Sequence, residues 1–178
     1  ELIKRIGEGS TSSVFTVKNK RTGDIYVAKI IHSDYMKFDG ALRNIIREIS
    51  ITPMIKHPAI IGVIGLSKTD FHNRKKPVLI LKNMENGTLK KLISKKDGRI
   101  TDTTKLIMLY GIASAMSFLH SNEIIHHDLR LENVLVDDQI HPQVCDFGFS
   151  KSLKTVSFDN SNYNRAGLII TPEESEDE

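Results

Sequence analysis

The sequence predicts an α+β fold in which a five-stranded, mainly antiparallel sheet carrying one helix precedes a mainly helical part. Short apolar runs rich in β-branched residues, divided by turn signals, dominate the first third of the chain and are typical of strands. One segment with helical spacing interrupts these runs, and a long apolar helix follows in the second half. With 178 residues, the chain is long enough for a sizeable core in one domain or slightly more.

The elements of the predicted sheet follow from the spacing of apolar residues. Strands are expected at Leu2–Ile6, Val14–Val17, Ile25–Ile31, Ile60–Leu66 and Val78–Leu81. A helix is predicted over Ala41–Ile51, because its apolar residues recur every three or four positions, and Pro53 ends it.

The pattern becomes helical after the turn signal Asn86-Gly87. A short helix is expected at Thr88–Ser94 and a long one at Thr101–Leu119, with Thr101 or Asp102 as N-cap. Because the middle of the long helix is apolar nearly all round, we expect it to be covered on more than one side. Short strands are expected at Val134–Val136 and Gln143–Cys145, and the segment from Thr155 is predicted to be loop ending in disorder.

Composition and charge exclude several classes of protein. A single Cys excludes an intramolecular disulfide framework and favours a cytoplasmic setting. No apolar run approaches the roughly 18 residues of a membrane span, and the first residues do not resemble a signal peptide. The net charge is +3, although five of the last six residues, 173–178, are acidic. Basic clusters at 73–76, 90–91 and 95–96 lack interleaved aromatic residues, so they are interpreted as solvated faces and no nucleic-acid partner is expected.

A glycine-containing segment between the first two strands is a candidate phosphate-binding loop. Residues 7–14 read Gly-Glu-Gly-Ser-Thr-Ser-Ser-Val; small residues let backbone N–H groups approach a polyphosphate, and Val14 would lie over a base. Alone this signal is weak, since Ser12 stands where a third Gly is expected. Lys29 lies in the middle of a strand and needs an anionic partner if it is buried. Glu48, 19 residues later on the predicted helix, is the candidate partner.

The strongest group of candidate residues lies in and after the segment Ile125–Val136. Asp128 and Asn133 are five positions apart between the long helix and a strand, and Asp146-Phe147-Gly148 follows the next strand. Oxygen atoms of Asn133 and Asp146 suit Mg²⁺ bound to a nucleotide phosphate. Asp128 is then left to orient a substrate hydroxyl group and to accept its proton.

Together these motifs resemble the eukaryotic protein kinase family. The order of motifs matches: the Gly-rich loop, Val27-Ala28-Lys29, Glu48, His57-Pro58, Leu81-Lys82-Asn83-Met84, the loop containing Asp128, and Asp146-Phe147-Gly148. In detail the sequence is closest to tyrosine-kinase-like serine/threonine kinases. The resemblance covers about residues 1–155. It implies transfer of the γ-phosphate of ATP to protein hydroxyl groups, with ATP and Mg²⁺ bound.

The resemblance also implies a role for each candidate residue. Lys29 would contact the α- and β-phosphates, Glu48 would hold Lys29, and Asp128 would be the catalytic base, with Asn133 and Asp146 on Mg²⁺. Arg130 is grouped with the catalytic residues; serine/threonine kinases usually have Lys at this position, and some tyrosine kinases have Arg. The stretches Leu131-Glu132-Asn133 and Phe149-Ser150-Lys151 favour Ser or Thr over Tyr as the acceptor. The expected nucleotide-binding set is Ile6, Gly7, Glu8, Gly9, Ser10, Ser12, Val14, Val27, Lys29, Lys82, Met84 and Leu135.

The family pattern further implies a division into lobes. The expected N-lobe is 1–81, the hinge 82–84, a partial C-lobe 85–172 and an acidic tail 173–178. The chain would be truncated at its C-terminus, because the helices that follow in the family are absent. A nucleotide- or protein-binding module without turnover is therefore the alternative function, and a small-molecule phosphotransferase is a weaker one.

Several residues depart from the family pattern. His127 stands where the family has an Arg that pairs with a phosphorylated activation segment, and a His can do so only when it is protonated. A zinc site of His120, His126 and His127 is less favoured than a packed core role for His126. Val27 and Thr52 replace the usual Ala and Leu or Met, and we expect them to reduce nucleotide affinity or to loosen the packing behind Glu48.

Overall fold

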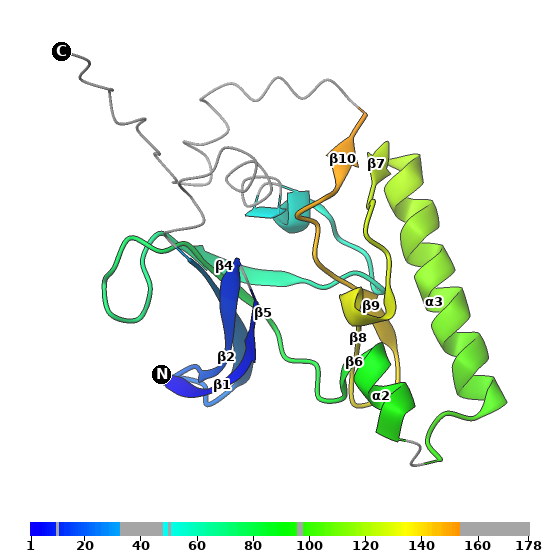
Figure 1. Cartoon of the computed structure of the whole chain (residues 1–178), viewed down its shortest axis with the longest axis horizontal. Helices are drawn as coiled ribbons and strands as arrows, with labels where there is room; N and C mark the ends of the chain where they lie inside the picture. The colour runs from blue at the N-terminus through cyan, green and yellow to red at the C-terminus, as the bar shows by residue number, and fades with distance from the viewer. Residues whose placement is uncertain (10, 33–47, 50, 96–97, 154–178) are drawn as a thin grey trace.

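The computed structural model describes residues 1–9, 11–32, 48–49, 51–95 and 98–153. Five strands form one antiparallel sheet in the order β1-β2-β3-β5-β4 (Figure 1). The strands are β1 Leu2–Glu8, β2 Ser12–Lys18, β3 Ile25–Ile31, β4 Val63–Ser67 and β5 Val78–Lys82. The predicted five-stranded antiparallel sheet is therefore confirmed.

The two faces of this sheet have different residues because side chains alternate along each strand. Ala28 and Ile30 of β3 are buried in a cluster with Val17 and Val78. Lys29 lies between them on the chain, so it emerges on the opposite face. Residues directly across from one another share a face, and Val14 and Leu79 are the two partners of Lys29.

The predicted strand Ile60–Leu66 is wrong at its beginning. β4 starts at Val63, because residues 59–61 are bonded elsewhere. The Val144 N–H group donates to the Ala59 carbonyl, and the Val144 carbonyl accepts from the Ile61 N–H group, both at 2.9 Å. The predicted strand Gln143–Cys145 is likewise displaced by one residue, to β9 Pro142–Val144.

After β5, the described chain contains the helices α2 Leu89–Lys95 and α3 Asp102–Ser121 and several short strands. Figure 1 shows α2 and α3 beside the small sheet of β6, β8 and β9. The segment between β5 and β6 joins this second part to the large sheet. The elements are β6 Gly87–Thr88, α2 Leu89–Lys95, α3 Asp102–Ser121, β7 Ile124–Ile125, β8 Val134–Val136 and β10 Lys151–Ser152, with 3-10 turns η2 Thr52–Met54 and η3 Leu131–Asn133. The Thr101 side chain caps α3 by accepting from the Thr104 N–H group, as one of the two predicted caps.

One side of α3 forms the core of this second part. Met108 packs with Leu92 and Val134, while Ala115 and Leu119 pack with residues including Phe147. The expectation that α3 is covered on more than one side is not met within the described ranges, where Leu106, Leu109 and Tyr110 are 69%, 65% and 78% exposed.

Several predicted features lie outside the described residues. These are the first seven residues of the predicted helix Ala41–Ile51, the loop from Thr155 and the acidic tail 173–178. Within the described part of the chain, no helix combines the length and the apolar character needed to cross a membrane.

Candidate active site

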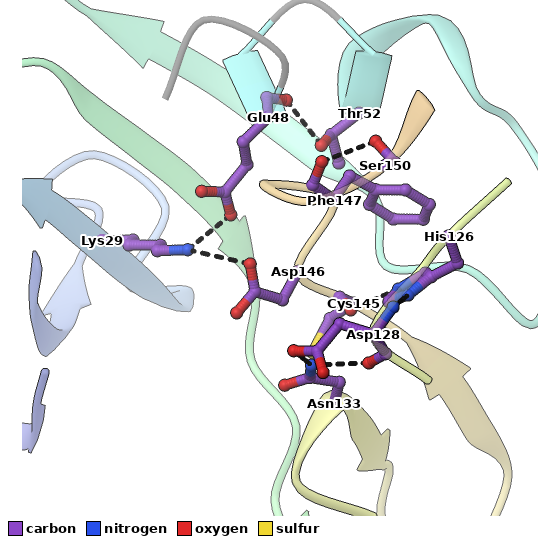
Figure 2. Close-up of polar contacts among 10 residues, drawn as sticks. All are labelled: Lys29, Glu48, Thr52, His126, Asp128, Asn133, Cys145, Asp146, Phe147 and Ser150. Atoms are coloured by element: carbon purple, nitrogen blue, oxygen red, sulfur yellow. Dashed lines mark hydrogen bonds and ion pairs between the residues drawn. The ribbon is translucent and has the colours of Figure 1, made fainter. Parts of the chain in front are cut away.

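Three charged side chains meet between the large sheet and the second part of the fold. Lys29 Nζ lies 2.5 Å from Glu48 Oε1 and 3.7 Å from Asp146 Oδ1, and Figure 2 shows the three groups pointing toward one another. The Lys29 and Glu48 side chains are only 15% and 11% exposed. Thr52, expected to loosen the packing here, donates its hydroxyl hydrogen to the Glu48 carbonyl at 2.6 Å. The pairing of Lys29 with Glu48 proposed from charge is thus present.

Burial and charge act in opposite directions on Lys29. Burial lowers the pKa of its ammonium group, but the negative charges of Glu48 and then Asp146 outweigh burial and raise the pKa above its ordinary value. Lys29 therefore stays protonated at neutral pH. A protonated amine between two carboxylates can also attract a phosphate group.

Asp128 and Asn133 are joined by their side chains. Asn133 Nδ2 donates to Asp128 Oδ2 at 2.8 Å and to the Asp128 carbonyl at 2.9 Å (Figure 2). Asn133 is 8% exposed at the end of η3. Since both bonds use its amide nitrogen, its Oδ1 atom remains available as an acceptor.

His126 connects the Asp128 loop to the segment that contains Asp146. Its Nδ1 atom accepts from the Asp128 N–H group at 3.2 Å, and its Nε2 atom lies 3.0 Å from the Cys145 carbonyl oxygen. Because that carbonyl only accepts, Nε2 carries the hydrogen. The ring is fully buried and packs edge-on against Phe147 at 5.1 Å. His126 is therefore a packed core histidine whose two nitrogen atoms are both bonded.

No group of three or more His, Cys, Asp and Glu side chains in the described ranges is placed to hold a metal ion. His127, expected to replace a phosphate-binding Arg, is exposed and has a φ of 64°.

Asp146 is turned toward Lys29 by the backbone around it. Its φ is 66°, a left-handed conformation that Asp adopts more readily than most residues. The next residue, Phe147, is fully buried in the core against α3, and its carbonyl accepts from Ser150 Oγ at 2.5 Å. Because Phe147 points into the core, the Asp146 carboxylate points out of it and is 40% exposed.

The predicted Gly-rich loop joins β1 to β2. The Gly9 N–H group donates to the Ser12 carbonyl at 2.9 Å, and Gly7 lies across from Val14, where a Cβ atom would be 3.5 Å from the Val14 Cβ. Ser12, at the position of the expected third Gly, is buried, and Ser10 lies outside the described residues. Gly7, Val14 and Lys29 therefore share one row across the sheet, which the strand register sets.

Sequence reasoning did not find a polar cluster at the base of this loop. His32 Nε2 lies 2.7 Å from Ser13 Oγ and 3.4 Å from Glu8 Oε1. Glu8 also accepts from Arg5 at 3.1 Å. Only the strand register, which places Ser13 near the end of β3, could have indicated it.

The predicted adenine-binding residues lie where the chain leaves β5. Lys82 ends β5, Met84 is 7% exposed, and the Met84 carbonyl accepts from the Gly87 N–H group at 3.0 Å. Leu135 of β8 lies across from Gln143 of β9. The Gln143 Oε1 atom is buried and has no hydrogen-bond partner within the described part of the molecule, so an unpaired acceptor adjoins Leu135.

Arg130 belongs to a charge network beside Asp128. Glu132 accepts from Arg130 Nε at 3.0 Å and from Lys90 Nζ, on α2, at 2.6 Å. The bonds from Arg130 and Lys90 lower the pKa of Glu132 to about 2. No sequence pattern predicts the bond from Lys90 to Glu132, because the two residues lie 42 positions apart.

Comparisons with known proteins agree with this geometry. The family described as the protein kinase domain matches residues 1–167. The human NUAK family SNF1-like kinase 1 is 31% identical over 84% of this chain, which corresponds to 22% of that relative. The CBL-interacting serine/threonine-protein kinase 13 of Arabidopsis thaliana is 30% identical over 84% of this chain and 29% of that relative. An Aurora kinase of Candida glabrata is 31% identical over 84% of this chain and 40% of that relative.

The chain thus spans less than half the length of each of these relatives. The family match covers nearly the whole chain, and the relatives agree on the same family. The predicted resemblance is confirmed: this chain belongs to the protein kinase domain family.

Proposed function

We propose that this chain is a protein kinase domain that transfers the γ-phosphoryl group of ATP to Ser or Thr hydroxyl groups of proteins. One observation carries the proposal: the Asp128 carboxylate is held at 2.8 Å by Asn133, while Lys29 and Asp146 form a second charged group nearby (Figure 2). The relatives include a serine/threonine-protein kinase of Arabidopsis thaliana, which supports Ser and Thr as acceptors. A cytoplasmic setting belongs to the proposal and is supported by the single Cys.

The nucleotide would lie on the sheet face that carries Lys29. That face includes Gly7 and Val14 in the same row, and Val27 lies on the same side of β3 two residues earlier. Lys29 would contact the phosphates, and its bond to Glu48 would fix its direction. The remaining members of the proposed nucleotide site are Ile6, Glu8, Gly9, Ser10, Ser12, Lys82, Met84 and Leu135. The proposed lobes are 1–81 and 85–172, joined by a hinge at 82–84.

Asn133 and Asp146 would hold Mg²⁺. The fit rests on their donor atoms: the Asn133 amide nitrogen is committed to Asp128, so its Oδ1 is available, and the Asp146 carboxylate is 40% exposed. Hard oxygen ligands of this kind suit Mg²⁺. When bound, the ion would offset charge on the phosphate oxygens.

Asp128 would act on the acceptor. The Ser or Thr hydroxyl group would donate its hydrogen bond to the Asp128 carboxylate and pass it the proton. The hydroxyl oxygen would then form the new bond to the γ-phosphorus while the bond to the β,γ-bridging oxygen breaks and ADP leaves. Asn133 keeps the carboxylate in one orientation, and Arg130 would support charge near the acceptor.

The test is Asp128→Asn, with Asp138→Asn, on an exposed turn, as the matched control. Asp128→Asn should abolish transfer of labelled phosphate to dephosphorylated casein, because its amide cannot accept the proton. Nucleotide binding should persist: ATP and Mg²⁺ at 100 times the dissociation constant should stabilise parent and variant alike by about 2.7 kcal/mol in thermal unfolding.

Equal transfer by Asp128→Asn and the parent would remove Asp128 from this role. A parent chain that binds ATP and Mg²⁺ but phosphorylates no protein would instead be the binding module without turnover.

A further inference from the structure

The charge network of Lys90, Arg130 and Glu132 offers no unoccupied carboxylate oxygen to a basic substrate side chain. Each Glu132 carboxylate oxygen already accepts from a cation: Oε1 from Lys90 at 2.6 Å and Oε2 from Arg130 at 3.0 Å. A third cation would have to displace one of these bonds. The Glu132 carboxylate is thus bonded to two positively charged side chains.

The two cations have donors to spare. The Lys90 and Arg130 side chains are 63% and 56% exposed. Within the described ranges, Arg130 bonds through Nε alone, so both terminal nitrogen atoms can form the parallel pair of bonds that a carboxylate accepts. Arg130 lies two positions after Asp128 in the same loop. Arg130 is therefore part of the loop where the acceptor hydroxyl would lie, and Lys90 is bonded to that loop through Glu132.

We propose that Lys90 and Arg130 form a subsite for acidic residues that flank the acceptor Ser or Thr, so that acidic protein segments are the preferred substrates. Glu132 is the positioning residue, because its two bonds hold the cations in place. The inference rests on the proposed function, which makes Asp128 the base. A purely structural alternative is that the network only fastens α2 to the loop; the experiment below separates the two.

The experiment compares two peptides on the full chain. One has the sequence of residues 171–178 of this chain, Thr-Pro-Glu-Glu-Ser-Glu-Asp-Glu, and the other has Lys at each acidic position. Fluorescence anisotropy measures the dissociation constant of each labelled peptide at low and at physiological salt. The variant is Lys90→Glu. The matched control is Lys105→Glu, which makes the same charge change in an exposed ion pair, 2.8 Å from Asp102 on α3.

The parent should bind the acidic peptide about tenfold more tightly than the basic one, and salt should reduce this preference. Lys90→Glu should reduce the preference about three- to tenfold, as expected for reversing one partly exposed charge, while Lys105→Glu should change it less than about twofold. If Lys90→Glu unfolds at a lower temperature than the parent, Lys90→Met replaces it. The expected reduction of the preference for the acidic peptide is then about half as large on a logarithmic scale.

Equal binding of the two peptides, tighter binding of the basic peptide, or equal losses in Lys90→Glu and Lys105→Glu would each overturn the inference. Phosphate transfer, measured in parallel, tests the proposed function separately. A binding preference without transfer to either peptide or to casein would leave the binding of acidic segments standing and defeat the proposed function, whereas transfer to both peptides without preference would do the reverse.

Discussion

Replacing Gly111 with Ala should destabilise the protein, although the same change in an isolated helix is stabilising. Gly111 lies in the middle of α3. A Cβ atom at this position would lie 2.6 Å from Pro142 Cγ and 3.2 Å from Pro142 Cδ. Pro142 belongs to β9, and its ring is tied to the backbone. The helix or the strand must therefore move to admit the methyl group.

Two opposing terms set the size of the effect. Ala is favoured over Gly in a helix interior by about 1 kcal/mol. Inserting a group into a filled space costs about 1–3 kcal/mol. The free energy of unfolding should therefore fall by up to about 2 kcal/mol, with a central expectation near 1 kcal/mol. Ser117→Ala, at an exposed position of the same helix, should gain a few tenths of a kcal/mol and serves as the matched control.

Urea denaturation measures both variants. The double variant Gly111→Ala/Pro142→Ala should recover most of the loss, because the contact atoms are gone, and the cycle should give a coupling energy of about 1 kcal/mol or more. A Gly111→Ala protein that is stabilised as much as Ser117→Ala, or a cycle without coupling, would refute the close approach of α3 to β9. Gly111→Ala should also weaken nucleotide binding slightly, because Asp146 lies four residues after Pro142 and would move with a displaced β9.

Three further predictions concern the charged and buried groups of the site. Glu48→Gln should lower the pKa of Lys29, since burial lowers it and Glu48 is the strongest opposing charge; the pH dependence of Lys29 acylation measures this, and a cost of about 3–5 kcal/mol in unfolding is expected for a broken buried pair. Burial raises the pKa of the Cys145 thiol to about 12, so the native chain should resist alkylation at pH 8 while the urea-unfolded chain reacts at once; equal rates in mass spectrometry would contradict this. The pKa of Glu132 is lowered from 4.5 to about 2, so its stabilising effect should be complete above pH 4.5 and be lost as the pH falls toward 2; carboxyl NMR titration of parent and Arg130→Gln should show the pKa rise in the variant.

Local patterns predicted the larger elements because those elements are built from their own residues. β3 and β8 begin and end where the apolar runs do, and the N-cap of α3 follows from Thr101 and its neighbours. The beginning of β4 could not be predicted, because Ile60 and Ile61 have the same apolar, β-branched character whether they pair with β5 or with Val144. The two-residue strands β6, β7 and β10 were not predicted, because they exist only through their pairing: β6 with β8, and β7 with β10.

In the site, too, some contacts could be predicted from residue type and others could not. A buried Lys needs an anion, so charge made Glu48 a candidate partner of Lys29, and the order of the kinase motifs selected it. The link between His126 and Cys145 did not, since the bond runs from a ring nitrogen to a backbone carbonyl 19 positions away. No residue type marks that carbonyl in the sequence. The bond from Lys90 to Glu132 could not be predicted either, because no feature of the sequence distinguishes Lys90 from the other Lys residues as the partner of Glu132.

Asp146 is the residue whose position depends on both parts of the fold. Its carboxylate lies 3.7 Å from Lys29 on the large sheet, but its backbone is fixed by the second part. The Cys145 N–H group donates to the Asn133 carbonyl at 2.9 Å, the Cys145 carbonyl accepts from His126 at 3.0 Å, and Phe147 is fully buried against α3. Both backbone hydrogen bonds of Cys145, the residue before Asp146, thus end at Asn133 and His126, the same residues that hold Asp128. The backbone of 145–147 therefore sets the spacing between the proposed base and the Lys29 ammonium. A substitution in the core around Phe147 should thus displace Asp146 and alter the phosphate site, although it changes no residue that would bind the nucleotide.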